Sequence, residues 1–472
     1  MRRFQPLRRP PARALFPLSA LTVALLLSAC AVGPDYQRPE LPAAPAQFKE
    51  DGAWRPAVPA AADAKQPWWQ AFGDADLNDL VVQANAANQT LRQAESQLRN
   101  AQALVLNAGA QLWPIVGVTG QAGRQRVFSP NVAQDTRGAA VQASWEPDFW
   151  GRARRGLEGA QASAAASDDD LAAARLSVQA AVVSSYVQLR IDDAMLDLLD
   201  RTVDGYRESL KVAQAQERAG VATPADVALA QSTLASAEAQ RVDMRLARAQ
   251  GEHALAVLLG RLPSSFSLPA KPLAFSLPAI PLLVPSQLLE RRPDVVASEQ
   301  RVHAANAQIG VAKAAWFPNL SLSASDGVTA LGQWAGAPLH VWSLGASVAA
   351  PLFDPGQLRS LNDQARAAYD GAVASYRQNV LAAFQDVEDQ LAAQRELARE
   401  RVFEDQALAA AVEAERVLAR QYEVGSASYV SLVTAQANSL AAGRTALQLQ
   451  GRELLAHVAL IRALGGGFGT EQ

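Results

Sequence analysis

Leu112-Trp-Pro-Ile-Val116 and Trp316-Phe-Pro-Asn-Leu320 are two versions of one motif, in which an aromatic–proline break precedes apolar residues. The two prolines are 204 positions apart (318 minus 114). Other matches recur at nearly the same spacing, including Gly220 with Gly425 and Leu259-Gly260 with Leu464-Gly465. A period of roughly 200 residues is far too long for a solenoid repeat of about 20–50 residues. The chain is therefore predicted to contain two copies of one structural half and to build a pseudo-symmetric assembly.

The two predicted copies have the same layout. The first spans 71–262 and the second 286–467, with a proline-rich linker at 263–285 and a short tail at 468–472. In each copy a helix of moderate length, expected at about 74–110 and 293–315, precedes the aromatic–proline break, and two short alternating segments follow it. A very long helix comes next, and a glycine turn then leads into a last helix. The expected long helices cover about 152–218 and 357–423, and roughly 65 helical residues extend about 100 Å.

Apolar residues in these long helices recur every seven positions, which is typical of coiled-coil packing. The series are Val182, Leu189, Leu196, Val203 and Leu210 in the first copy, and Leu440, Leu447, Leu454 and Ile461 in the last helix. Two separate coiled-coil hairpins in solution would show the same periodicity. The alternating segments argue against that alternative.

The N-terminus predicts export and lipidation. Residues 1–29 contain several arginines followed by an apolar run of about 15 residues, which is typical of a signal peptide and shorter than a membrane-spanning helix. The run ends Leu27-Ser28-Ala29-Cys30, which matches a bacterial lipobox, and Cys30 is the only cysteine. A simple signal anchor with an incidental cysteine is the alternative. No aspartate follows Cys30, so we expect the outer membrane, with 30–70 as a lipidated N-terminal tether.

The alternating segments predict four strands, at about 112–127, 137–149, 317–327 and 339–351. Ser321 and Ser323 alternate with Leu320 and Leu322, which gives one polar and one apolar face. Such strands suit a membrane β-barrel, in which the polar face lines water and the apolar face meets lipid. A small sheet on a soluble helical body is the alternative, and the lipobox makes it the less favoured one.

Four strands cannot close a barrel around a pore, because small barrels need about eight, and lipid does not tolerate open sheet edges. Several chains must therefore share one barrel, and three chains would supply twelve strands. The expected fold is mostly α-helical with a membrane β-barrel, and three duplicated chains would form a helical tube of pseudo-sixfold symmetry.

Several functions are excluded by what the sequence lacks. A net charge of −3 argues against a nucleic-acid partner, which would leave a basic footprint. The four histidines are scattered, without the spacing of metal ligands. There is no glycine-rich phosphate loop and no nucleophile elbow. We therefore predict neither enzymatic activity, nor a metal, nor a cofactor other than the lipid on Cys30.

The chain resembles the TolC-like outer membrane efflux proteins, and among them the lipidated OprM/NodT-like subgroup. The matching motifs cover about 30–467 in the family's order. They are the lipobox followed by Val32-Gly-Pro-Asp-Tyr36, Trp68-Trp69, Arg291-Arg-Pro-Asp-Val295, Ala315-Trp-Phe-Pro-Asn-Leu320, Pro351-Leu-Phe353, and Tyr422 with Gly425. Together these motifs are highly specific, although none is so alone.

The resemblance implies a homotrimer in the cell outer membrane, with a twelve-stranded barrel continuing into a long periplasmic α-helical tunnel. It implies docking onto a periplasmic adaptor and an inner-membrane pump, which we expect to be of the RND type. The function implied is a passive export duct, gated at its periplasmic end. A coiled-coil lipoprotein or adhesin without a pore is the alternative. The sequence does not identify the transported substrate.

The resemblance also implies where the gate lies, namely at the turns of Gly220 and Gly425. Asp226 matches the family's aspartate in the first copy, and Tyr422 matches a tyrosine that bonds across to that region in the closed state. Asp226 is the partner expected for Tyr422 here. As an alternative role, Asp226 could simply stabilise the start of its helix.

The second copy departs from the family pattern. Relatives often carry aspartates at the positions of Ser431 and Thr434, and some carry an arginine at Ala427. Acidic rings attract cations because like charges brought together sum their fields. We therefore expect a weaker field at this entrance, supplied by Asp226 alone. If the gate is placed correctly, Asp226→Ala or Tyr422→Phe should raise the resting conductance.

Overall fold

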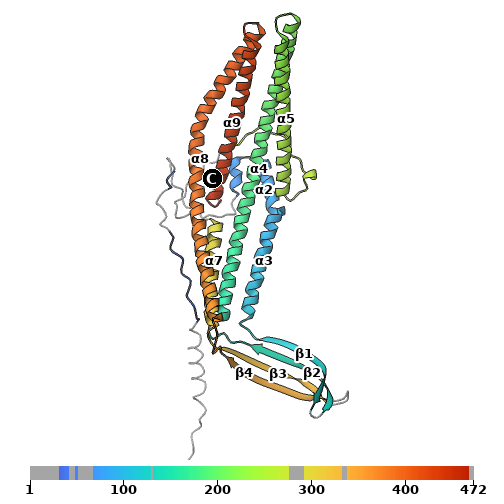
Figure 1. Cartoon of the computed structure of the whole chain (residues 1–472), viewed down its shortest axis with the longest axis vertical. Coiled ribbons are helices and arrows are strands. Elements are labelled where there is room, and N and C mark those ends of the chain that lie inside the picture. The colour runs from blue at the N-terminus through green and yellow to red at the C-terminus, as the bar shows by residue number, and fades with distance from the viewer. Residues whose placement is uncertain are drawn as a thin grey trace, which may run out of the picture. The chain divides into compact units, whose positions relative to one another are not determined.

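The computed structural model describes residues 31–41, 48–50, 67–128, 131–275, 292–331 and 337–466. They fall into two compact units. Unit 1 contains Met1–Pro39, Arg99–Ala166 and Ser298–Tyr376, and unit 2 contains Glu40–Leu98, Ser167–Ala297 and Arg377–Gln472. The elements, labelled in Figure 1, are η1 (Trp68–Phe72), α2 (Ala75–Ala87), α3 (Gln89–Ala110), β1 (Ile115–Phe128), β2 (Asn131–Trp145), α4 (Arg152–Arg218), α5 (Pro224–Leu258), η2 (Pro263–Ser265), α7 (Pro293–Ala314), β3 (Asn319–Leu331), β4 (Leu339–Ala349), α8 (Gln357–Glu423) and α9 (Tyr429–Ala463).

The long helices of the two copies correspond residue for residue. α4 and α8 begin 205 positions apart (357 minus 152), and α5 and α9 are offset by the same number (429 minus 224). Both ends of each pair keep this offset, so every position on one hairpin has a defined counterpart on the other. Figure 1 shows the two hairpins, with α5 running back along α4 and α9 running back along α8.

One expected helix is divided. The sequence predicted continuous helix from about 74 to 110, whereas α2 ends at Ala87 and α3 begins at Gln89. Asn88 between them has extended backbone (φ −63°, ψ 130°) and is buried. Its side chain accepts from the N–H of Leu91 at 3.1 Å and donates to the carbonyl of Leu258 at 2.8 Å. Asn88 thus starts α3 and ties it to the end of α5.

The four strands form one antiparallel sheet in the order β1-β2-β3-β4. β2 begins at Asn131, earlier than the expected 137, and pairs with β1 along its whole length. The predicted alternation is present in the pairing: Val118 faces Val141, and Ala324 faces Leu344. On the opposite face, the hydroxyls of Ser325 and Ser343 are 2.8 Å apart. Each strand therefore separates an apolar from a polar face.

The apolar face of the sheet is open in the described chain. Leu344 is 80% exposed, and several large side chains on the same face are also exposed: Val116, Val118, Val141, Trp342 and Val348. Within the described residues, the outer strands β1 and β4 each pair on one side only. The sheet therefore has a largely apolar face, interrupted by the exposed pair of Asp326 and His340, and two open edges.

The aromatic–proline motif that marks the repeat joins the two copies beside the sheet. The indole N–H of Trp150, just after β2, donates to the carbonyl of Pro318 at 2.7 Å. Its ring stacks on Phe317, with centroids 4.8 Å apart. In the first copy, the indole N–H of Trp145 donates to the carbonyl of Leu112 at 3.1 Å. The proline-linked turns are thus fixed by tryptophan donors at the start of β1 and of β3.

In unit 2, α9 packs closely on α4. A Cβ added at Gly443 would lie 3.1 Å from Leu198, and one at Gly451 would lie 2.4 Å from Ile191. The side-chain amide of Gln436 donates to the hydroxyl of Ser209 at 3.2 Å in the same interface. Higher numbers on α9 meet lower numbers on α4, so the two helices run antiparallel. Glycine allows this close approach because it has no side chain.

The predicted heptad positions lie in these helix contacts. Val182, Leu189 and Val203 are fully buried, and so, within a few per cent, are Leu454 and Ile461. Leu196 and Leu447 are partly buried. Residues facing a neighbouring helix are therefore well marked by the seven-residue period.

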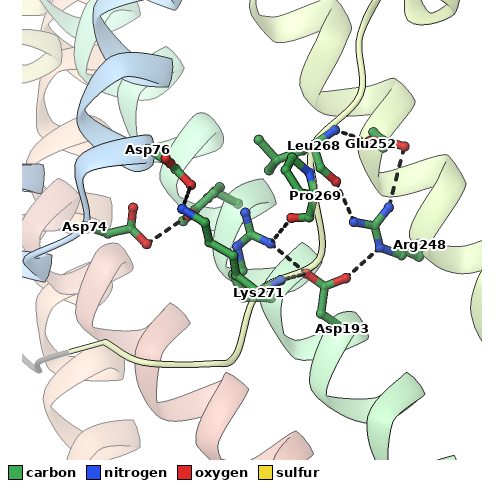
Figure 2. A network of polar contacts seen from close by, with 10 residues as sticks. Asp74, Asp76, Asp193, Arg248, Glu252, Leu268, Pro269 and Lys271 are labelled. Atoms are coloured by element: carbon green, nitrogen blue, oxygen red, sulfur yellow. Dashed lines mark hydrogen bonds and ion pairs between the residues drawn. The ribbon is translucent and has the colours of Figure 1, made fainter. Parts of the chain in front are cut away.

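The described part of the linker, 263–275, is held against α4 and α5 by charged side chains (Figure 2). Asp193 of α4 lies at the centre of this network, where it accepts from Arg190 at 2.7 Å and from Arg248 at 2.6 Å. Arg190 also donates to the carbonyl of Pro269, and Arg248 donates to that of Leu268. The polar groups of an irregular segment are thus satisfied by buried arginines.

The same segment reaches α2. Lys271 forms an ion pair with Asp76, visible in Figure 2, and the hydroxyl of Tyr186 donates to Asp74 at 2.8 Å. Phe275 packs edge-on against the ring of Tyr186, with centroids 5.9 Å apart. Residues 263–275 of the linker therefore fasten α2, α4 and α5 together. No helix among the described residues is both long and apolar enough to cross a membrane.

Candidate functional site

Two tight turns at the ends of the helical hairpins form the candidate site. Gly220 and Gly425 both have φ of +75°, a left-handed conformation that favours glycine. In the first turn, the N–H of Gly220 donates to Glu217 and that of Val221 donates to Gln216, each at 2.8 Å. The second turn repeats this pattern from Gly425 and Ser426. Both helices therefore end in the same glycine cap.

A capping box starts the helix after the first turn. Thr223 accepts from the N–H of Asp226 at 3.3 Å, and the Asp226 carboxylate accepts from the N–H and the hydroxyl of Thr223 at 2.9 and 2.8 Å. Pro224 occupies the first helical position, where its missing N–H costs nothing. The backbone N–H of Thr223, followed by its hydroxyl, holds the pKa of the Asp226 carboxyl below its usual value. Asp226 is therefore charged at neutral pH.

The second turn has the same geometry without the charge. Ser428 caps α9, and its hydroxyl lies 2.8 Å from that of Ser431, the counterpart of Asp226. The hydroxyl of Thr434 donates to the carbonyl of Val430 at 2.8 Å within the helix. The hydroxyls of Ser431 and Thr434 therefore form their hydrogen bonds within the first turns of α9 and its cap. Neither Ser431 nor Thr434 supplies a charge like that of Asp226 in the first turn.

Tyr422 lies in a small apolar cluster between the two hairpins. The cluster contains Ala213, Val227, Ala230, Tyr422, Tyr429 and Leu432, and it joins the ends of α4, α5, α8 and α9. The side chain of Tyr422 is 4% exposed. Its ring lies 5.6 Å from that of Tyr429, centroid to centroid. The tyrosine therefore helps to pack the two tips against each other.

The expected hydrogen bond from Tyr422 to Asp226 is not formed within the chain. The Tyr422 hydroxyl is buried and has no hydrogen-bond partner among the described residues. The Asp226 carboxylate accepts instead from Thr223. Burial, followed by the negative charge of Asp226, raises the pKa of Tyr422. Asp226 and Tyr422 therefore interact electrostatically without a hydrogen bond. The Tyr422 hydroxyl has no acceptor among the described residues.

Tyr429 is a member of this cluster that the sequence did not reveal. Burial, with smaller effects of Tyr422, Tyr206 and Asp226, raises its pKa to about 12. Seven positions separate Tyr422 from Tyr429, but the turn at Gly425 interrupts the helix between them. Helical periodicity therefore could not place both rings together, and no other local signal marks Tyr429.

The N-terminal segment forms a second region of interest. Cys30, the expected lipidation site, lies outside the described residues, but the chain is defined from Ala31. The N–H of Val32 donates to the carbonyl of Trp150 at 3.0 Å, and the ring of Tyr36 stacks on His303, with centroids 4.5 Å apart. In the same unit Asp35 pairs with Arg155 at 2.7 Å, and Arg38 pairs with Glu299 at 2.8 Å. Residues 31–39 are therefore bound firmly along unit 1.

The described residues contain no group of three or more His, Cys, Asp or Glu side chains able to hold a metal ion. What the tips offer is a glycine-shaped turn, one aspartate, and a buried tyrosine with a free hydroxyl. Such groups can modulate an opening, but they lack a nucleophile and base pair.

Comparison with known proteins gives concordant results. The family model for outer membrane efflux proteins matches twice, at residues 80–261 and 284–466. The chain is 33% identical to a pyoverdine export outer membrane protein, OpmQ of Pseudomonas aeruginosa, over 96% of this chain and 98% of that protein. It is 31% identical to a probable efflux pump outer membrane protein, TtgC of Pseudomonas putida, over 96% of this chain and 95% of that protein.

A solved structure shares the fold. The outer-membrane channel OprN superposes with a TM-score of 0.83 at 31% identity, covering 93% of this chain and 99% of that one. The two matches of the family model also correspond to the two sequence copies, since each contains one long helical hairpin and one pair of strands.

Proposed function

The chain belongs to the outer membrane efflux protein family, and from this premise we propose how it works as the outer membrane duct of an export system. It is an outer membrane efflux channel that extends into the periplasm. Three copies form one channel, in which each chain contributes four strands to a barrel of twelve. The helical hairpins of the three chains continue the barrel as a periplasmic tube.

The observation that carries this proposal is the sheet with one apolar face and two open edges. Unpaired strand edges are not tolerated in lipid, because their N–H and C=O groups would lack partners. One chain cannot remove those edges by closing on itself, since four strands are too few for a pore. Joining β1 of one copy to β4 of the next satisfies both edges. The apolar face, with Leu344 and Trp342, then meets lipid, and the serine face lines water.

The hairpin tips form the gate of the tube. The turns at Gly220 and Gly425 expose Val221 and Val424, which are 73% and 78% accessible, and these tips contact a periplasmic adaptor. The cluster around Tyr422 holds the two tips of one chain together. Opening requires the tips to move apart, and the charge of Asp226 acts at the entrance.

Transport through the duct is passive. An inner-membrane pump of the RND type supplies the energy and selects the cargo, and the adaptor links that pump to the channel. The duct itself performs no catalysis and holds no cofactor. Genes for an adaptor and a pump next to this one would support the assignment of these partners.

Lipid attached to Cys30 adds an anchor to the barrel. Its support is the lipobox and the firm binding of the residues that follow, in particular Val32 and Tyr36. Replacing Cys30 by Ser should abolish incorporation of labelled palmitate. Incorporation that persists in Cys30→Ser would contradict this part of the proposal.

Single-channel recording of the purified full-length protein in a planar bilayer tests the main function. Discrete conductance steps are expected, together with a heat-sensitive trimer band on a denaturing gel. A non-channel coiled-coil lipoprotein or adhesin would give neither. Relatives named as efflux or export proteins also disfavour that alternative.

A further inference from the structure

All six ionisable residues of the four strands lie on one face of the sheet. They are Arg124 and Arg126 on β1, Asp135 and Arg137 on β2, Asp326 on β3, and His340 on β4. The uninterrupted register places them on the face of Val118, Val141 and Leu344, which the proposed channel turns towards lipid. The opposite face carries no ionisable residue within the described strands. Charge on a lipid-facing surface is costly unless it lies near the membrane boundary, so this placement needs a physical reason.

The charged residues lie in the part of the sheet that is remote from the helices. The strands connect to helices at Ile115, Trp145, Asn319 and Ala349, and their other ends lead into the hairpins. On β1, Arg124 lies nine positions beyond Ile115 (124 minus 115), which is about 30 Å of strand. A strand tilted by about 40° then rises about 23 Å, close to the apolar band of about 25 Å in a membrane barrel. Arg124 is therefore at the outer boundary of that band.

Three arginines on β1 and β2 form one basic group. Arg124 and Arg126 are two positions apart on one strand, so their side chains leave the same face about 7 Å apart. Arg137 is paired with Ala122 and is thus a diagonal neighbour of Arg124, at about 7–8 Å. Asp135 is paired with Arg124. On this face of the two strands, three positive charges therefore stand against one negative charge.

The contact of Asp135 with the basic group is loose. Its carboxylate lies 3.5 Å from Nε of Arg124, which is longer than the roughly 2.7–2.9 Å of a strong charge-assisted hydrogen bond. The Arg124 side chain is 75% exposed, and Arg126 is also exposed. On β3 and β4, by contrast, Asp326 and His340 pair with each other at 2.7 Å. The excess positive charge of the sheet is thus concentrated on β1 and β2.

We propose that the basic group of Arg124, Arg126 and Arg137 binds the phosphate groups of an anionic lipid in the outer leaflet, namely lipid A, the phosphorylated anchor of lipopolysaccharide. A guanidinium binds phosphate through two parallel N–H donors, which a surface lysine could not do. The proposal rests on the proposed function, because the orientation of the duct places the helices in the periplasm and the hairpin ends of the strands at the outer leaflet.

The surface around the basic group fits a lipid better than a free anion. Val116, Val118 and Val141 lie on the same face, between the arginines and the helix ends of their strands, and all three are exposed. Basic and apolar surface are therefore continuous along β1 and β2. An amphipathic molecule can place its phosphates on the arginines and its acyl chains along the valines, whereas inorganic phosphate would use the arginines alone.

Titration of the purified full-length protein with lipid A in a neutral detergent tests the site. The readout is the temperature at which the heat-sensitive trimer dissociates, which a bound ligand raises. Lipid A should raise this temperature for the natural sequence. Arg124→Gln combined with Arg126→Gln should require at least about tenfold more lipid A for half of the rise. Inorganic phosphate at the same concentration should have no effect.

Arg399→Gln combined with Arg416→Gln is the matched control. It removes the same amount of charge from exposed positions on α8 and should respond to lipid A as the natural sequence does. Salt provides a second measurement that needs no variant. Raising the ionic strength from about 0.05 to 0.5 M should weaken the response to lipid A about tenfold, because salt screens exposed charges. The neutral lipid phosphatidylcholine should show no such dependence.

Several results would overturn the lipid site. An unchanged response of the Arg124 and Arg126 double variant would do so, and so would a response to lipid A that is independent of salt. An equal response to phosphatidylglycerol would assign the site to anionic lipids in general and refute the assignment to lipid A. Trimers that conduct but do not respond to lipid A would refute the site and leave the channel intact. A natural sequence that yields neither trimers nor conductance would refute the proposed function itself.

Discussion

Thr223 and Asp226 close on each other at the first hairpin tip, with the carboxylate accepting from the threonine N–H at 2.9 Å. No hydrogen bond joins this carboxylate to the buried hydroxyl of Tyr422 in the described chain. The aspartate is thus both a helix cap and a fixed negative charge at the proposed entrance. The two roles can be separated by mutation.

Asp226→Ala should raise the resting conductance, because it removes a charge and frays the start of α5. Losing the acidic N3 residue of the capping box destabilises the start of the helix by about 0.3–1 kcal/mol. Thr223→Ala is the control, since it removes the threonine cap and keeps the charge. Single-channel recordings of both variants distinguish the causes. An equal rise in both would assign the effect to the cap, and no change in either would exclude Asp226 from the gate.

Ser431→Asp should increase the preference of the channel for cations over anions. Three copies would gain three carboxylates at the counterpart of Asp226, and their fields add. The variant should fold normally, because an acidic residue in the first turn of a helix is favourable by about 0.3–1 kcal/mol. Reversal potentials in a salt gradient provide the measurement, with Ser431→Asn as the neutral control. An unchanged reversal potential would show that Ser431 does not face the ion path.

Tyr422→Phe should leave stability unchanged or slightly raise it, since the hydroxyl has no partner in the described chain. Tyr422→Ala should destabilise the tip by about 3–5 kcal/mol through the cavity that it leaves. Protease susceptibility of the tips and thermal dissociation of the trimer report these effects. If Tyr422→Phe also makes the tips more susceptible to protease or opens the channel, the Tyr422 hydroxyl has a partner in a neighbouring copy.

Asp193→Asn should strongly lower the stability of unit 2. Arg190 and Arg248 would lose their common counter-charge in a buried site, a change that typically costs about 3–5 kcal/mol. Limited proteolysis within 263–275 should accelerate, because both arginines also hold that segment. Asp197→Asn, in an exposed pair on the same helix, is the control and should have little effect. Equal sensitivity of the two variants would contradict the role of the network.

Lowering the pH below about 4 should destabilise the start of α7. Burial raises the pKa of the Asp294 carboxyl, but the hydrogen bonds and charge of Arg292 outweigh it, so that this pKa lies below its usual value. A depressed folded-state pKa stabilises the protein above the unfolded value of about 3.9, and that contribution is lost as the pH falls through the folded value. This contribution is at most about 1 kcal/mol, because the half-exposed carboxylate is screened by solvent. Arg292→Gln should flatten the dependence of thermal stability on pH below 4. A variant that keeps the full acid dependence would assign it to other carboxylates.

Much of the fold follows from local patterns in the sequence. The seven-residue period marks Val182, Leu189 and Val203, which are buried in helix contacts. The strands follow from two-residue alternation, because each side chain in a strand has a fixed face. Gly220 and Gly425 follow from the left-handed conformation that a helix-terminating turn requires. Each of these signals depends on residues close together in the chain.

The partner of Asp226 illustrates what such patterns leave undecided. The sequence allowed both a cap and a bond to Tyr422. In the described chain the cap with Thr223 is formed and the bond to Tyr422 is not. The division of the first helix at Asn88 depended on a carbonyl 170 positions away. Tyr429 joined the tip cluster through a turn that breaks helical periodicity.

The sequence by itself determined the duplication, the helical and strand periods, and the family, because all of these follow from the spacing of residues along the chain. Only the tertiary structure decided which helix surfaces are buried inside the chain and which are exposed. Leu198 of α4 packs against Gly443, whereas Phe403, which lies 205 positions later on α8, is 70% exposed. The physical reason is that burial depends on what lies across a helix contact, and residues that meet there can be hundreds of positions apart.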